Sequence, residues 1–137
     1  MKIYLDFIIT GKGIDVEKIN DILEFLPTKS SDIRYNFWQC KIEEVREPYW
    51  NYKTEKVHTE DSDIQIGEFL KKFDGKADKL KAYFTTCELM PKVSLGLIIC
   101  PDEYNEEGNE VLCFNSVSIS RENIKKLADL NCEIYFD

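Results

Sequence analysis

Residues 2–27, KIYLDFIITGKGIDVEKINDILEFLP, predict a strand followed by a helix. In residues 2–10 apolar side chains alternate with others, a period of two that is typical of a strand with one buried face. Gly11-Lys12-Gly13 predicts a turn, and Asp15 predicts a helix N-cap. Apolar residues then recur at helical spacing as far as Pro27, which ends the helix because the residue before a proline avoids the helical region. The apolar helical positions are Ile19, Ile22, Leu23 and Leu26.

A second unit of the same kind is predicted near the end of the sequence. A shift of 105 positions places Ile119 on Ile14 and the cap Ser120 on the cap Asp15. Two strand–helix–strand units that share one sheet give the ferredoxin-like arrangement, with the helices on one face. Any capped amphipathic helix between two strands would align equally well, so this likeness has two explanations.

We therefore expect one α+β domain over residues 1–137, with a mainly antiparallel sheet, helices packed on one face, and a ferredoxin-like pseudo-repeat with an inserted helix and an extra strand. The inserted helix is expected at 66–73, after a capping box that begins at Ser62. The extra strand is expected at 92–100, where Ile98 on the second face indicates a central position. The other expected elements are a strand at 33–43, a polar loop at 44–61, helical turns at 77–84, an acidic turn at 101–110, a strand at 111–119, a helix after Ser120 and a strand at 132–136.

The composition is that of a globular protein, with 43% hydrophobic and 32% charged residues. Most of the formal net charge of −8 comes from residues 101–137, which hold nine acidic and three basic residues. Nucleic acids and anionic membranes attract clustered Lys and Arg, so neither is expected as a partner. The charge is compatible with a basic protein partner. The alternative is that the net charge only keeps the protein soluble.

Neither the first residues nor the cysteines indicate export. Asp6 interrupts the apolar run in residues 1–10, no small-residue cleavage site follows, and the run is too short to span a bilayer. The five cysteines are odd in number and contain no C-x-x-C pair, which argues against a disulfide framework and against a zinc site. We expect a cytoplasmic protein with free thiols.

Catalytic, metal and cofactor sites are not predicted. The one histidine, His58, lies in the polar loop, and adjacent loop residues do not supply the rigid nucleophile and oxyanion hole that a catalytic triad needs. Gly11-Lys12-Gly13 lacks the third glycine of a dinucleotide fingerprint, because Val16 occupies that position. An EF-hand alignment on Gly108 would place Phe114 at the bidentate position, so a solvated hairpin turn is the better interpretation.

The order of several segments carries a resemblance to a known family. They are the opening strand that runs into Gly-Lys-Gly-Ile-Asp at 11–15, the helix end Leu-Glu-Phe-Leu-Pro-Thr at 23–28, a strand around Trp38, the helix with Phe69-Leu70, and residues 117–137. Together they resemble a bacterial family of uncharacterised domains, domain of unknown function forty-two seventy-nine, over nearly the whole chain. The resemblance implies a small bacterial α+β domain and supplies no catalytic residues.

Two groups of residues are candidate partner-binding sites. Tyr49, Trp50 and Tyr52 are of the aromatic kind that concentrates at interface hot spots, although such residues also cover core edges under long loops. The acidic turn provides the second group. Its carboxylates are Asp102, Glu103, Glu106, Glu107 and Glu110.

Three functions stay open at this point. The preferred one is a protein-binding module, such as an immunity-type inhibitor whose acidic surface steers it to a basic partner. The second is a small-ligand-binding protein or an enzyme with a cleft between the sheet and the helices, marked by perturbed carboxylates or a low-pKa cysteine. The third is a structural homodimer formed through an edge strand.

Overall fold

The alternation in residues 2–10 produces the strand at the centre of the sheet, β1 (Lys2–Thr10). Its odd-numbered residues are buried and its even-numbered residues are half-buried on the opposite face. β7 (Lys92–Cys100) pairs antiparallel with β1 over its whole length, and its Val93, Leu95 and Leu97 are buried in the core. The computed structural model describes residues 2–31, 35–36, 41–42, 47–100, 103–104, 107–108, 110–111 and 117–137.

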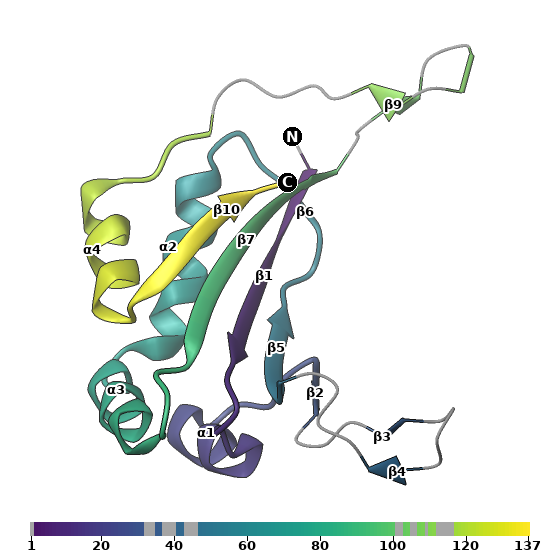
Figure 1. Ribbon diagram of the computed structural model, residues 1–137. Coiled ribbons are helices and arrows are strands. Elements are labelled where there is room, and N and C mark those ends of the chain that lie inside the picture. Colours follow the sequence, from purple (N-terminus) through teal and green to yellow (C-terminus); the bar gives the residue numbers. More distant parts are fainter. Residues whose placement is uncertain are drawn as a thin grey trace.

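The main sheet has the strand order β10-β7-β1-β5-β2, and β6 pairs with the start of β1 (Figure 1). The further strands are β2 (Lys29–Ser31), β5 (Tyr49–Lys53), β6 (Val57–His58) and β10 (Cys132–Phe136). β10 runs parallel to β7, and the other pairs are antiparallel. The expected α+β fold with a mainly antiparallel sheet is therefore confirmed.

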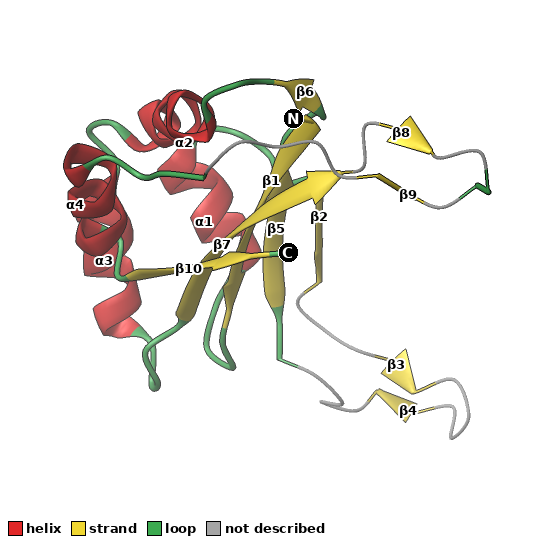
Figure 2. Cartoon of the chain, turned by 90° about the horizontal axis from the view of Figure 1, so that it is seen from above, coloured by secondary structure: helices red, strands yellow, loops and turns green. Residues whose placement is uncertain are grey.

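Helices cover one face of this sheet, as Figure 2 shows from above. They are α1 (Val16–Leu23), α2 (Ser62–Leu70), the short 3-10 helix η1 (Lys71–Phe73), α3 (Ala77–Thr86) and α4 (Arg121–Asp129). Between helices and sheet lies an aromatic cluster in which Phe7 contacts Trp50, Phe69 and Phe73, with ring centroids 5.0–6.0 Å apart. The apolar core lies between the helices and the sheet.

The ferredoxin-like topology is present, but its parts differ from the prediction. β5 lies between β1 and β2, and β7 lies on the other side of β1, so β1-α1-β2-β5-α2/α3-β7 forms the ferredoxin-like unit. The added elements are α4 and β10, which the 105-residue shift treated as half of the repeat. The prediction was wrong because β10 runs parallel to β7. A parallel neighbour needs a crossover connection, which α4 supplies.

Two helix boundaries also differ from those predicted. α1 ends at Leu23, because Glu24 adopts a left-handed conformation with φ of 62°, and Leu26 is consequently 73% exposed. The cap of α2 is Asp61, whose side chain accepts a hydrogen bond from the backbone of Asp63. Ser62 is instead buried inside the first turn.

Strand predictions outside the central pair were partly wrong. The predicted loop at 44–61 contains β5 and β6. Within the predicted strand at 33–43, β3 (Tyr35–Asn36) pairs antiparallel with β4 (Lys41–Ile42), so these segments belong to two strands. In the predicted strand at 111–119, residues 112–116 lie outside the described part, and residues 117–119 do not form a strand.

A polar contact joins α2 to α4. The Asp63 carboxylate accepts hydrogen bonds from the Ser120 backbone N–H and from the Asn123 amide, both at 2.8 Å, and Asn123 also donates to the Asp63 carbonyl at 3.1 Å. Burial raises the pKa of Asp63, but these hydrogen bonds outweigh it and lower the pKa below 3.8. The ionised carboxylate is therefore the form that holds α4 against α2.

This contact predicts a pH dependence of stability. The depressed pKa contributes stability that is present above the unfolded pKa and is lost as the pH falls through the folded pKa, below about pH 4. We expect Asp63→Asn to lower the free energy of unfolding at neutral pH and to flatten its dependence on pH in the acid range. Urea denaturation at several pH values tests this, with exposed Asp78→Asn as the control. Equal acid dependence in wild type and Asp63→Asn contradicts it.

The partner residue offers an independent test. Asn123→Ala removes both of its hydrogen bonds to Asp63 and leaves a nearly buried site unfilled. We expect a loss of about 1–3 kcal/mol in the free energy of unfolding, measured by urea denaturation at neutral pH. A loss as small as that of an exposed substitution on α4, such as Lys125→Ala, would show that the contact contributes nothing.

Candidate functional site

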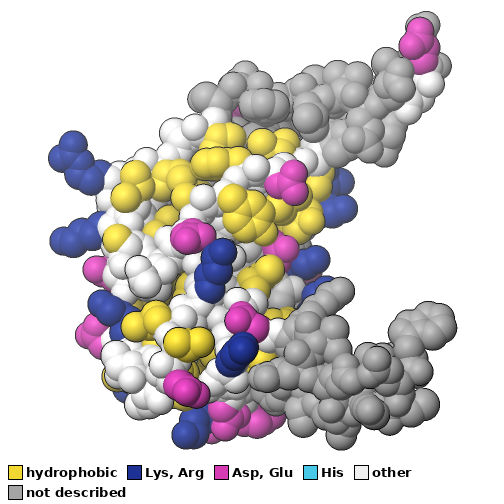
Figure 3. Space-filling model, viewed as in Figure 1, with side chains coloured by type: hydrophobic (Ala, Val, Ile, Leu, Met, Phe, Trp, Pro, Cys, Tyr) yellow, Lys and Arg dark blue, Asp and Glu magenta, His cyan; other side chains and the backbone are white. Residues whose placement is uncertain are grey.

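The second face of the sheet is not covered by any described helix. We call it the open face. Figure 3 views it, and hydrophobic side chains lie there among both positive and negative ones. The strand registers place the following residues on it: Tyr4, Asp6, Ile8, Thr10, Tyr49, Asn51, Lys53, Lys29, Ser94, Gly96, Ile98, Glu133 and Tyr135.

A glycine shapes the middle of the open face. Gly96 lies in register between Asp6 on β1 and Tyr135 on β10. A Cβ atom on Gly96 would clash with Cζ of Tyr135, so the tyrosine ring lies across the strand where a side chain would otherwise stand. The ring reaches toward β1, and Asp6 is among the charges that raise the pKa of Tyr135, after burial.

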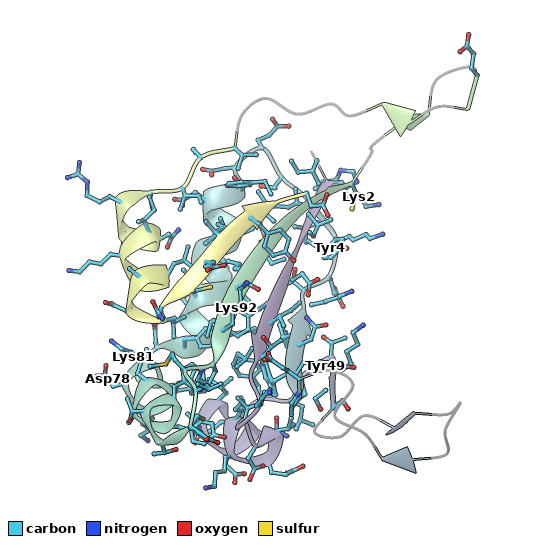
Figure 4. All side chains as sticks on the ribbon, viewed as in Figure 1. Lys2, Tyr4, Tyr49, Asp78, Lys81 and Lys92 are labelled. Atoms are coloured by element: carbon cyan, nitrogen blue, oxygen red, sulfur yellow. The ribbon has the colours of Figure 1, made fainter. Side chains whose placement is uncertain are left out.

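A pocket lies on the open face, over β1, β5 and β2. Its volume is about 420 Å³, within the range of small-molecule sites. Figure 4 shows Tyr4 and Tyr49 on the strands of this face. The lining residues are Asp6, Ile8, Thr10, Lys29, Glu47, Tyr49, Asn51 and Lys53.

Asn51 is the most constrained residue of the pocket. It is only 2% exposed, and its amide nitrogen donates to the Asp6 carboxylate and, at 3.0 Å, to the Phe7 carbonyl. Both partners are acceptors, which fixes the orientation of the amide. Its oxygen, Oδ1, has almost no accessible surface and no hydrogen-bond partner among the described residues. A buried acceptor without a donor costs about 1–3 kcal/mol.

The charged residues of the pocket balance each other. Asp6 and Glu47 carry negative charges, and Lys29 and Lys53 carry positive ones. Lys29, Lys53 and Glu47 are exposed, whereas Asp6 is half-buried. None of these four side chains forms an ion pair with another described residue. Asp6, which accepts from the Asn51 amide, is thus the least exposed of the four charges, and the other three lie at the rim.

The predicted aromatic group is divided between the two faces of β5. Tyr49 lines the pocket, but Trp50 is 0% exposed and its Nε1 donates to Asn20 Oδ1 at 2.8 Å. Tyr52 is half-buried and stacks on Phe69 in the core. The expectation of one aromatic contact surface is corrected, because alternate residues of a strand point to opposite faces.

The predicted acidic group lies mostly outside the described residues. Asp102 and Glu106 lie outside the described residues, and the side chains of Glu103 and Glu110 are likewise not described. The backbones of Glu103 and Glu110 lie in β8 (Glu103–Tyr104) and β9 (Glu110–Val111), which pair antiparallel as a hairpin does. Glu107 is exposed. Partner binding by these carboxylates stays a prediction.

The described cysteines are half-buried and unpaired. Cys87, Cys100 and Cys132 are free thiols, and burial raises the pKa of Cys132 to about 12, which keeps that thiol protonated. In the described ranges, no three or more His, Cys, Asp and Glu side chains are grouped so that they could hold a metal ion. No described helix has both the length and the apolar character needed to cross a membrane.

Sequence reasoning missed the polar residues of the pocket. The sequence pattern identified Asp6 only as an interruption of an apolar run and did not identify Asn51. A polar residue within an alternating apolar strand is the available signal, because it marks the face that points away from the core. The contact between Asp6 and Asn51, 45 residues apart, requires the pairing of β1 with β5.

These features define a class of protein: an α+β domain with helices on one face of its sheet and a polar pocket on the other. The family described as "Domain of unknown function (DUF4279)" matches residues 1–137, and the chain belongs to that family. The resemblance noted from the sequence is thereby confirmed over the whole chain. No curated protein and no solved structure matches it.

The contact between Gly96 and Tyr135 gives a test of the open face. Gly96→Ala should displace the Tyr135 ring and lower the free energy of unfolding by about 1 kcal/mol or more. In a Tyr135→Ser background the same substitution should be neutral or stabilising, because alanine fits a strand better than glycine does. Urea denaturation of the four proteins measures the difference. Equal cost in both backgrounds would show that the ring does not lie over Gly96.

Proposed function

We propose that this chain is a protein-binding module whose contact surface is the open face of the sheet. The observation that carries the proposal is the pocket of about 420 Å³ on that face, which is lined by Tyr49 and by charged side chains of both signs.

The composition of the open face supports a protein as the partner. Tyr4, Tyr49 and Tyr135 lie on it, and tyrosine is enriched at protein interfaces because its ring buries apolar area while its hydroxyl bonds. Positive and negative side chains lie between them. This favours a partner that places an opposite charge against each of these side chains. The acidic excess of the chain supports a basic partner in a general way.

A binding role is preferred over a catalytic one. Neither histidine nor cysteine occurs among the described residues that line the pocket, and its rim charges are exposed to water. Catalysis by acid–base groups gains from the exclusion of water. A cytoplasmic location is part of the proposal and is supported by the free thiols of the described cysteines.

Small-ligand binding is the second candidate, favoured by the volume of the same pocket. The pocket lies on the opposite side of the sheet from the cleft that the sequence suggested. In that case a compound of low molecular weight would saturate the pocket, and no protein would be needed to fill the rest of the open face.

Affinity capture with matched variants tests the proposed function. The variant Tyr49→Ser changes the open face, and Lys81→Gln changes the exposed surface of α3, away from it (Figure 4). We expect a protein that wild type and Lys81→Gln retain and Tyr49→Ser loses. With that protein purified, calorimetry should show an affinity loss of about tenfold or more for Tyr49→Ser.

Mapping completes the test. Amide shift changes on adding the purified partner should fall on β1, β5 and β2. The proposal is overturned if no protein is captured, if Tyr49→Ser binds as wild type while its circular dichroism shows a normal fold, or if the shift changes fall on the helices. Displacement of the partner by a second copy of the chain, seen as a dimer in light scattering, would favour the homodimer instead.

A further inference from the structure

We infer that the outer edge of β10 accepts an extended segment of a basic protein, which adds one antiparallel strand to the sheet. The segment carries basic side chains on the open face and apolar side chains on the helix side, the face that the helices cover. In Figure 1 β10 lies beside β7 at the margin of the sheet. This edge lies apart from the pocket over β1, β5 and β2, so the inference goes beyond the proposed function.

The direction of the backbone groups shows which residues of β10 face the outer edge. Asp137 directs both of its groups to β7, because its N–H donates to a β7 carbonyl at 3.0 Å and its carbonyl accepts from a β7 N–H at 2.8 Å. The two directions alternate along a strand, so Glu133 and Tyr135 also bond to β7, whereas the N–H and C=O groups of Ile134 and Phe136 point outward. Within the described part of the chain, no strand pairs with that edge.

β10 lacks the features that protect an edge strand from pairing. Lysine, proline and short length serve that purpose, and β2, at the other end of the sheet, is three residues long and carries Lys29. β10 has five residues, with neither lysine nor proline. It also exposes two aromatic side chains, Tyr135 at 39% and Phe136 at 53%. A strand added to this edge would cover part of that apolar area, as in other cases where a sheet recognises an extended peptide.

The charges beside the edge favour a basic segment. Glu133 and Asp137 lie on the open face near the two ends of the strand, and opposite charges on directly opposed residues stabilise a pair of strands. Lys92 forms an exposed ion pair with Glu133 at 3.9 Å, a weak interaction that offsets only one of the two carboxylates. The exposed Arg121 and Lys125 belong to α4, which lies on the helix side. Basic side chains are therefore favoured on the open face, opposite residues 133 and 137.

The backbone directions and the charges together define a sequence pattern. Residues opposite Ile134 and Phe136 form the backbone hydrogen bonds and lie on the helix side, so they are apolar, and the two outer residues are basic. The pattern is basic, apolar, any residue, apolar, basic. A second copy of β10 that paired Ile134 with Phe136 would place Glu133 opposite Asp137, and like charges opposite each other destabilise a pair of strands. A different protein is therefore favoured over a second copy.

A peptide with the sequence Lys-Val-Thr-Val-Lys between short glycine spacers serves as the probe in an NMR titration. We expect saturable shift changes at Ile134 and Phe136 and slower hydrogen exchange of these two amides, which exchange fast in the free protein. The Tyr135 amide, already bonded to β7, should change little. Methylation of both valine nitrogens should abolish binding because these N–H groups face β10. Methylation of the threonine nitrogen, which points away from β10, should preserve it.

Variants of the chain test the charges and the direction of the segment. Glu133→Gln and Asp137→Asn should each weaken binding of this peptide about twofold to fivefold, and Lys81→Gln on α3 should leave it unchanged. Asp137→Lys should favour Glu-Val-Thr-Val-Lys over Lys-Val-Thr-Val-Glu, because an antiparallel segment places its first residue opposite residue 137. Phe136→Pro removes an outward N–H, so it should weaken binding more than Phe136→Ala, which keeps that group.

Several outcomes overturn the inference. They are the absence of saturable shift changes with the basic peptide, equal binding of Glu-Val-Thr-Val-Glu, binding that survives methylation of both valines, and protection of the Ile134 and Phe136 amides in the free protein. A dimer in light scattering that Phe136→Pro dissociates would show that a second copy occupies the edge. If a purified partner shifts β1, β5 and β2 but no peptide binds β10, this inference fails and the proposed function stands. If the basic peptide pairs with β10 but no partner binds the open face, the proposed function fails and this inference stands.

Discussion

The structure depends on the alternation of side chains along β1 and β7. Their odd-numbered apolar residues are buried in the core, except Ile99 near the end of β7, which is half-buried. Each fully buried side chain stabilises the fold by about 1.5–3 kcal/mol. A shift of either strand by one residue would move the whole apolar set to the open face. The core therefore fixes the register, and the register fixes which polar residues meet on the other side.

The polar pocket follows from this constraint. Asp6 lies between the buried Leu5 and Phe7, so it must point away from the core, and Asn51 lies between Trp50 and Tyr52 in the same way. The pairing of β1 with β5 brings the two together and holds the Asn51 amide in one orientation. A strand that is central in the sheet thus carries both core residues and pocket residues, at alternate positions.

The sequence predicted the elements whose signals are local. Alternation in 2–10 and 92–100 gave both central strands, and the caps Asp15 and Ser120 gave the starts of α1 and α4. It did not predict which strands are neighbours, because pairing depends on contacts between distant residues. The second half of the proposed repeat was misassigned for that reason. The five residues of β10 do not indicate whether the strand runs parallel or antiparallel to its neighbour. The pocket was missed because it exists only after β1, β5 and β2 have paired.

Accessibility of the open face is the property that the whole account requires, and a soluble paramagnetic agent measures it directly. In protein labelled at the isoleucine methyl groups, Ile8 and Ile98 on the open face should relax several times faster than Ile3 and Ile9 beneath the helices. Equal protection of all four methyl groups would show that the second face is covered, and would contradict a contact surface there.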